Sequence, residues 1–177
     1  MFFIESEEEF AICPNCGEIL KYHCWVSRPV IDITGEKETY LIRILKCLNT
    51  ACPTTYHREL PDIITPYKRY STESIEEAID TENTNITVAA DQSTIYRWRK
   101  WFKTSVVYIM MALLSVSVTI GHNTKTPSLE IIKQNTNKPL EIIKETVSRK
   151  VKWLNETVRI LVNSSKWNFN RSAFLTG

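Results

Sequence analysis

Several features of other protein classes are missing from this sequence. No aspartate follows Thr104, and the glutamates beyond it fall on predicted helices. That part of the chain therefore lacks the separated carboxylates with which a nuclease core holds metal ions. The N-terminus has neither the positive start nor the long apolar core of a secretory signal. We therefore expect a cytoplasmic protein, in which five cysteines favour metal binding over disulfides.

Composition places the chain among ordinary folded proteins. It has 177 residues, 43% hydrophobic and 24% charged, which is enough for one domain with an appendage or for two or three small modules. The net charge of +2 hides a gradient: residues 1–65 carry ten acidic and six basic side chains, and residues 125–177 carry four and ten. A polyanionic partner would therefore meet the C-terminal two thirds.

One uncharged segment, residues 105–121, is about as long as the shortest membrane spans. Three serines and a threonine dilute its apolar character. A buried core helix explains so short a run better than a membrane span does, and we do not expect a membrane partner.

Two pairs of cysteines predict a metal site in the N-terminal part. Cys13 and Cys16 are two residues apart and precede Gly17, and Cys47 and Cys52 follow a predicted hairpin. Short strands are expected over residues 19–26, 30–33 and 40–46, where apolar side chains are strand-like in pattern. A hairpin that brings the two pairs together is typical of a zinc ribbon. Four thiolates leave no open coordination position, so the zinc would be structural.

The ligand set has two alternative members. The second pair is separated by four residues, so His57 could replace Cys52 in a site of three cysteines and one histidine. Cys24 is a spare candidate, although a lone cysteine in a strand is more often a small buried apolar residue.

A basic helix is predicted to begin near Ser93. Ile95, Trp98 and Phe102 share one face, the other face is basic, and residues 92–103 include no acid. With helices over residues 74–81 and 86–90, it would form a helix-turn-helix whose recognition helix contacts DNA. A solvated basic face is the alternative. The predicted DNA contacts are Lys68, Arg69, Ser93, Thr94, Tyr96, Arg97, Arg99, Lys100 and Lys103.

A long amphipathic helix is predicted over residues 140–161. Its apolar residues recur at steps of three and four along about six turns. They are Leu140, Ile143, Val147, Val151, Leu154, Val158 and Leu161. This stripe would pack on the helix over residues 105–119, form a homodimer, or dock a transposase partner. The aromatic residues of the tail, 164–177, show no period and receive no assignment.

The ordered motifs resemble a known group of proteins. They are CPNCG at residues 13–17, HCW at 23–25, IRI at 42–44, LPD at 60–62, PYKRYS at 66–71 and STIYRWRKWF at 93–102. Over residues 10–104 the sequence is similar to a bacterial mobile-element family that resembles the zinc-ribbon and helix-turn-helix N-terminal regions of insertion-sequence transposases. The resemblance implies double-stranded DNA as partner and a role in transposition.

These observations predict an α+β protein with a zinc ribbon over residues 1–62, a helix-turn-helix unit over 63–104 and a helical packing or oligomerisation region over 105–177. The expected function is that of a zinc-containing, nucleoid-associated DNA-binding factor of a mobile element, without enzymatic activity of its own. A transcription regulator with the same DNA-binding unit and a zinc-ribbon adaptor between proteins are the alternatives.

Overall fold

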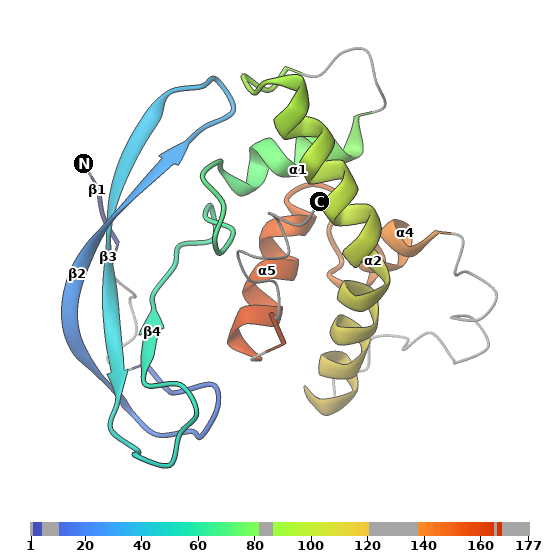
Figure 1. The fold of residues 1–177 in the computed structure, drawn as a ribbon. Helices are drawn as coiled ribbons and strands as arrows, with labels where there is room; N and C mark the ends of the chain where they lie inside the picture. The colour runs from blue at the N-terminus through green and yellow to red at the C-terminus, as the bar shows by residue number, and fades with distance from the viewer. Residues whose placement is uncertain (1, 5–10, 82–86, 121–137, 165, 168–177) are drawn as a thin grey trace.

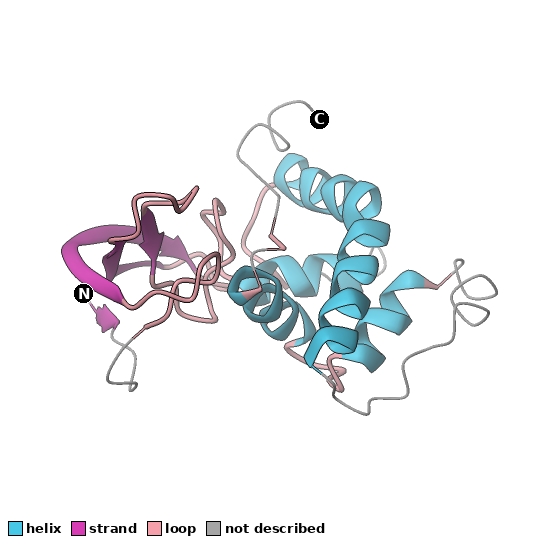
Figure 2. Ribbon diagram, turned by 90° about the horizontal axis from the view of Figure 1, so that it is seen from below, coloured by secondary structure: helices cyan, strands magenta, loops and turns pink. Residues whose placement is uncertain are grey.

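The computed structural model describes residues 2–4, 11–81, 87–120, 138–164 and 166–167. Within these residues the fold is α+β, with a sheet on one side and helices on the other (Figures 1 and 2). The predicted linker over 122–127, the segment 128–137 and the tail beyond Trp167 lie outside the described residues.

Strand β3 (Lys37–Cys47) is the centre of the sheet. Strand β2 (Leu20–Ile31) pairs antiparallel with it along its whole length. On the other edge, β1 (Phe2–Ile4) pairs in parallel with residues 40–42 and β4 (Tyr56–Arg58) pairs antiparallel with residues 44–46. The predicted hairpin is therefore confirmed, whereas β1 and β4 were not anticipated because three-residue strands carry too little pattern.

The turn between the two long strands is built by Asp32 and Gly35. The carboxylate of Asp32 accepts hydrogen bonds from the backbone N–H groups of Thr34 and Glu36, at 2.9 and 2.8 Å. Gly35 has a positive φ of 94°, and a Cβ atom there would lie 2.9 Å from the Cβ of Ala89. Both its backbone angle and its surroundings therefore require glycine.

The described helices share one core. They are α1 (Thr72–Asp80), α2 (Gln92–Ile120), α4 (Pro139–Thr146) and α5 (Trp153–Asn163). Trp153, Leu154 and Leu161 of α5 are completely buried against Ile109 and other residues of α2. Helix α2 continues through the predicted boundary between residues 104 and 105, so the basic and the apolar segments form one rod of 29 residues.

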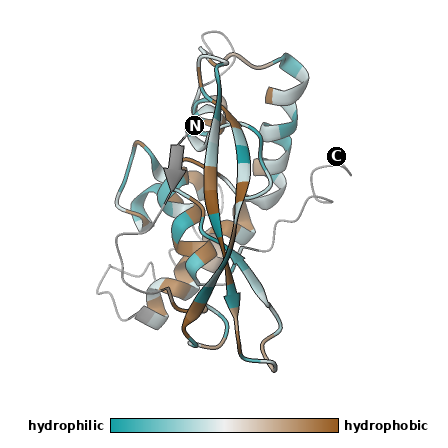
Figure 3. Ribbon diagram, turned by 90° about the vertical axis from the view of Figure 1, so that its left-hand side faces the viewer, coloured by the Kyte–Doolittle hydropathy of each residue, from teal (hydrophilic) through white to brown (hydrophobic). Residues whose placement is uncertain are grey.

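Helix α2 is the one described helix that is long and apolar enough to cross a membrane by length and composition. Half of the most apolar stretch of α2 is buried inside the protein, as in the core helix of a folded protein. Hydrophobic and hydrophilic stretches are interspersed along the two long strands, as seen from the sheet side (Figure 3).

Two predictions about helices are wrong. The short second helix over residues 86–90 is absent from the described residues 87–90. There the N–H of Ala89 instead donates to the carbonyl oxygen of Ile33 at 3.0 Å, which holds the segment in a non-helical form beside the hairpin. The long helix over 140–161 is two helices, because Ser148 and Lys152 adopt positive φ angles of 54° and 59° that interrupt a helix.

Candidate functional site

The sheet brings the four predicted cysteines together at one end. Their sulfur atoms all lie within 4.8 Å of one another and belong to Cys13, Cys16, Cys47 and Cys52. Leu20 at the start of β2 pairs with Cys47 at the end of β3, so the hairpin places the first cysteine pair beside the second. Cys13, Leu20, Leu45 and Cys47 form a small buried cluster of their own.

Backbone geometry aims each pair of sulfurs at one point. In the first loop, the N–H of Gly17 donates to the carbonyl oxygen of Cys13 at 2.9 Å, and the φ of Gly17 is +75°. A Cβ atom at this glycine would contact nothing, so its backbone angle alone favours glycine. In the second loop, the N–H of Cys52 donates to the carbonyl oxygen of Asn49 at 3.0 Å.

The spacing of the sulfurs suits a tetrahedral metal ion. Thiolates bound to zinc at 2.3 Å in tetrahedral geometry lie about 3.8 Å apart. The Sγ atoms of Cys13 and Cys52 are 3.7 Å apart, and those of Cys16 and Cys47 are 3.6 Å apart. The four cysteines can therefore hold one metal ion.

Two of the thiols, those of Cys16 and Cys47, differ in how readily they lose a proton. A hydrogen bond from the backbone of Glu18 lowers the pKa of Cys16 to about 7, whereas burial raises the pKa of Cys47 to about 12. Metal ions bind thiolates, so binding releases these protons. The thiolate of exposed Cys16 is consequently available at a lower pH than that of Cys47.

The two spare ligands lie outside the cluster of four. His57 is close to it, with Nε2 3.4 Å from the Sγ of Cys13 and 3.2 Å from the carbonyl oxygen of Thr54. Its ring can donate a hydrogen bond to the Cys13 sulfur and so offset the negative charge of four thiolates. Cys24 pairs with Ile44 in the middle of the sheet and is not part of the metal cluster.

The predicted DNA contacts fall into two groups: residues at the protein surface, and two cations engaged inside the protein. Tyr96, Arg97, Lys100 and Lys103 are exposed on the N-terminal half of α2. Arg69 is exposed in the loop before α1. Ser93 and Thr94 donate their hydroxyl hydrogens to the carboxylate of Asp91, which caps α2, at 2.5 and 2.9 Å. These bonds also lower the pKa of Asp91 to about 2.

Lys68 and Arg99 are engaged inside the protein. The ammonium group of Lys68 is buried over the ring of Trp101, with 4.7 Å between the nitrogen and the ring centroid. Arg99 donates from Nε to the carbonyl oxygen of Ala78 at 2.8 Å and from Nη2 to that of Thr81 at 2.6 Å. Both cations thus lie against the helical core instead of facing a ligand.

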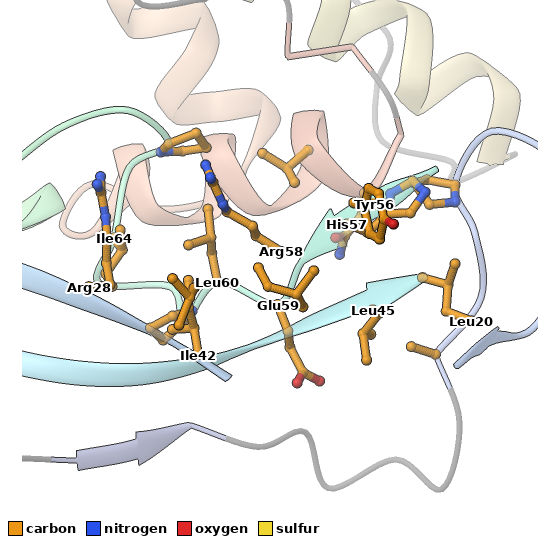
Figure 4. Close-up of a pocket in the computed structure, with 18 of the residues that line it drawn as sticks. Leu20, Arg28, Ile42, Leu45, Tyr56, His57, Arg58, Glu59, Leu60 and Ile64 are labelled. Atoms are coloured by element: carbon orange, nitrogen blue, oxygen red, sulfur yellow. The ribbon is translucent and has the colours of Figure 1, made fainter. Parts of the chain in front are cut away.

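A groove lined by arginines is a feature that the sequence did not indicate. It lies between the sheet and α5 and is lined by Arg28 of β2, Arg58 of β4 and Arg159 of α5 (Figure 4). Arg28 stands in a strand of mixed composition, and nothing local to β2 shows that β4 brings a second arginine beside it.

Comparison with known proteins gives one partial match. Residues 13–98 are similar to a family described as a domain of unknown function, DUF6431. The match begins at the first metal-cluster cysteine and ends at Trp98 in α2, so it includes strands β2, β3 and β4, the metal cluster and α1. No curated protein and no solved structure matches the chain.

Proposed function

We propose that the protein is a zinc-stabilised, non-enzymatic protein that binds double-stranded DNA through α2. The observation that carries this proposal is the exposed cationic surface of Arg97, Lys100 and Lys103, three residues apart on a rigid helix. The opposite face of the same segment is anchored in the core by Ile95, Trp98 and Phe102. Exposed Tyr96 adds an aromatic side chain with a hydroxyl to this surface.

The role of the metal in this proposal is structural. The cysteine set is complete with four sulfur ligands, which is the composition of structural zinc sites. Zinc, when bound, would hold the two cysteine loops at the end of the hairpin and supply no reaction. The likeness of residues 10–104 to mobile-element DNA-binding regions supports a role as an accessory, targeting or regulatory factor of such an element.

Fluorescence anisotropy with labelled duplex DNA tests the proposal. The double variant Arg97→Ala with Lys100→Ala is compared with Lys138→Ala with Lys150→Ala, which removes two exposed cations away from α2. We expect the first variant to bind more weakly and the slope of log affinity against log salt to fall by about 2, one unit per lost phosphate contact. Equal affinity and slope in the two double variants would contradict DNA binding by α2.

The choice of duplex tests the mobile-element role separately. Element-end duplexes and random duplexes of the same length are compared at the same salt concentration, because affinity depends steeply on salt. A factor that targets element ends binds the former more tightly, whereas a transcription regulator does not distinguish them. An adaptor between proteins shows no salt-dependent affinity for either.

A further inference from the structure

The groove between the sheet and α5 is large and open to solvent. Its volume is ≈ 1810 Å³, well above the range of about 300–1,000 Å³ found for small-molecule pockets. Its apolar floor includes Ile42, Leu60 and Ile64, and it extends past His57 at the metal-cluster end (Figure 4). Such a groove suits a segment of an extended polymer better than a compact ligand.

Arg28 and Arg58 line the groove, and within the described residues neither forms an ion pair with a carboxylate. Arg28 donates from Nη2 to the carbonyl oxygen of Lys68 at 2.5 Å, and its Nε is buried without a partner. Burial lowers the pKa of Arg28, and the positive charges of Arg58 and Arg69 lower it further, so both of these arginines lie close enough to repel Arg28. In Figure 4, Arg28 and Arg58 point from the sheet to the same side of the groove.

The two carboxylates that line the groove, those of Glu59 and Asp62, face arginines other than Arg28 and Arg58. Arg43 binds the Glu59 carboxylate with two hydrogen bonds, at 2.5 and 2.9 Å. Asp62 lies 3.9 Å from a nitrogen of Arg159 on α5. Within the described part of the chain, no ion pair joins a carboxylate to Arg28, Arg58 or Arg69. Arg28 and Arg58 therefore carry positive charge that an anionic ligand would balance.

Aromatic side chains are exposed along the same groove. Tyr56 is 51% exposed and Tyr67 56% exposed, although both line the groove. Tyr67 also has a positive φ of 65°, a conformation that costs a residue other than glycine about 1–3 kcal/mol. The fold therefore holds a strained tyrosine at the edge of the groove, where its ring faces solvent.

We propose that this groove binds single-stranded nucleic acid, with Arg28 and Arg58 contacting phosphates and Tyr56 and Tyr67 stacking on bases. Cationic grooves with exposed aromatic rings are typical of single-strand binding, because every base offers a face for stacking. A duplex keeps its bases stacked on one another, so it cannot offer them to these rings. The inference goes beyond duplex binding by α2, since both the surface and the ligand are different.

The experiment uses the full, zinc-loaded chain and three labelled probes. They are an oligothymidylate of about 20 nucleotides, a duplex of the same length and inorganic polyphosphate, which has the charge but no bases. The variants are Arg58→Ala, Tyr67→Gly and the control Lys150→Ala. Tyr67→Gly removes the ring and places glycine at a positive φ, so we do not expect weaker binding by this variant to come from loss of folding.

We expect Tyr67→Gly to weaken oligothymidylate binding at least about fivefold, as loss of one stacked base does, with no effect on polyphosphate. Arg58→Ala should weaken binding of the oligothymidylate and leave duplex binding unchanged, and Lys150→Ala should leave both unchanged. The proposal is overturned if the wild-type chain does not bind the oligothymidylate. It is also overturned if Tyr67→Gly or Arg58→Ala binds it as tightly as the wild type. Duplex binding through α2 is measured separately, so either proposal can fail alone.

Discussion

The ammonium group of Lys68 lies 4.7 Å from the centroid of the Trp101 ring, and the lysine side chain is buried. The aromatic ring stabilises the charged form, but burial has the larger effect and lowers the pKa of Lys68 from 10.5 to about 7. A residue that resembles a surface cation in the sequence is therefore a titratable group of the core.

This burial predicts how stability depends on pH. Between pH 7 and 10.5 the unfolded chain binds more protons at Lys68 than the folded chain does, so the free energy of unfolding should rise with pH across that range. Lys68→Met should remove this contribution and stabilise the protein most at pH 7 and below. Urea unfolding at several pH values measures the difference between variant and wild type. For exposed Lys100→Met, the difference in free energy of unfolding from the wild type should not change with pH. The same constant difference for Lys68→Met would contradict the titration of Lys68 in the core.

Arg97 and Arg99 should separate binding from stability. Arg99 donates to two carbonyl oxygens at the end of α1, and loss of such charge-assisted bonds costs about 1.5–3 kcal/mol. Arg97 is exposed and donates from Nη2 to the hydroxyl oxygen of Ser93 at 3.2 Å. Arg99→Ala should therefore lower the free energy of unfolding by about this amount, whereas Arg97→Ala should change it by less than about 0.5 kcal/mol. Chemical denaturation measures the free energy of unfolding of both variants. Equal losses in Arg97→Ala and Arg99→Ala would show that Arg99 does not stabilise the fold more than Arg97 does.

The sequence predicted features that depend on local spacing and missed those that depend on distant partners. Cysteine spacing and strand alternation were sufficient for the hairpin and the cysteine cluster. The apolar stripe of residues 140–161 correctly gave the buried positions Ile143, Leu154 and Leu161 but not the break between the helices. Val151, which belongs to that stripe, is 74% exposed in the connection, because periodicity reports which face is apolar and not where a helix stops.

Glu76 of α1 explains where α5 begins. Its buried carboxylate accepts hydrogen bonds from the backbone N–H groups of Lys152 at 2.6 Å and Leu154 at 2.9 Å. It thus satisfies unpaired donors at the start of α5 from a residue 76 positions earlier in the chain. No pattern within residues 140–161 could indicate this partner.

Replacement of this carboxylate should be costly. In Glu76→Gln the amide retains one acceptor oxygen, and its NH₂ group faces a backbone donor, so one buried N–H loses its bond. We expect a loss of about 1–3 kcal/mol in the free energy of unfolding. Glu73→Gln, an exposed acid in the same helix, is the matched control and should have little effect. Thermal and urea unfolding check both, and a Glu76→Gln variant as stable as Glu73→Gln would show that the two hydrogen bonds do not stabilise α5.

Metal removal should destabilise the cysteine end of the sheet more than the helical core. The buried cluster around the cysteines has four residues, two of which are ligands, whereas the helical core has its own buried residues from α1, α2, α4 and α5. Chelation should therefore expose the hairpin end near Cys13 and Cys47 while the helices remain folded. Hydrogen exchange should show lost protection at Leu20 and Leu45, with little change at Ile109.

Cysteine variants identify the ligands in the same measurement. Cys16→Ser and Cys52→Ser should lower bound zinc and reproduce the exchange pattern of the chelated protein, because serine is a poor ligand for zinc. Cys24→Ser, outside the cluster, should retain one zinc ion per chain. His57→Ala should retain zinc but bind it more weakly, by about 10–100-fold, if its ring supports the Cys13 sulfur from outside the ligand set. Full zinc content in Cys52→Ser with complete loss in His57→Ala would instead make His57 the fourth ligand.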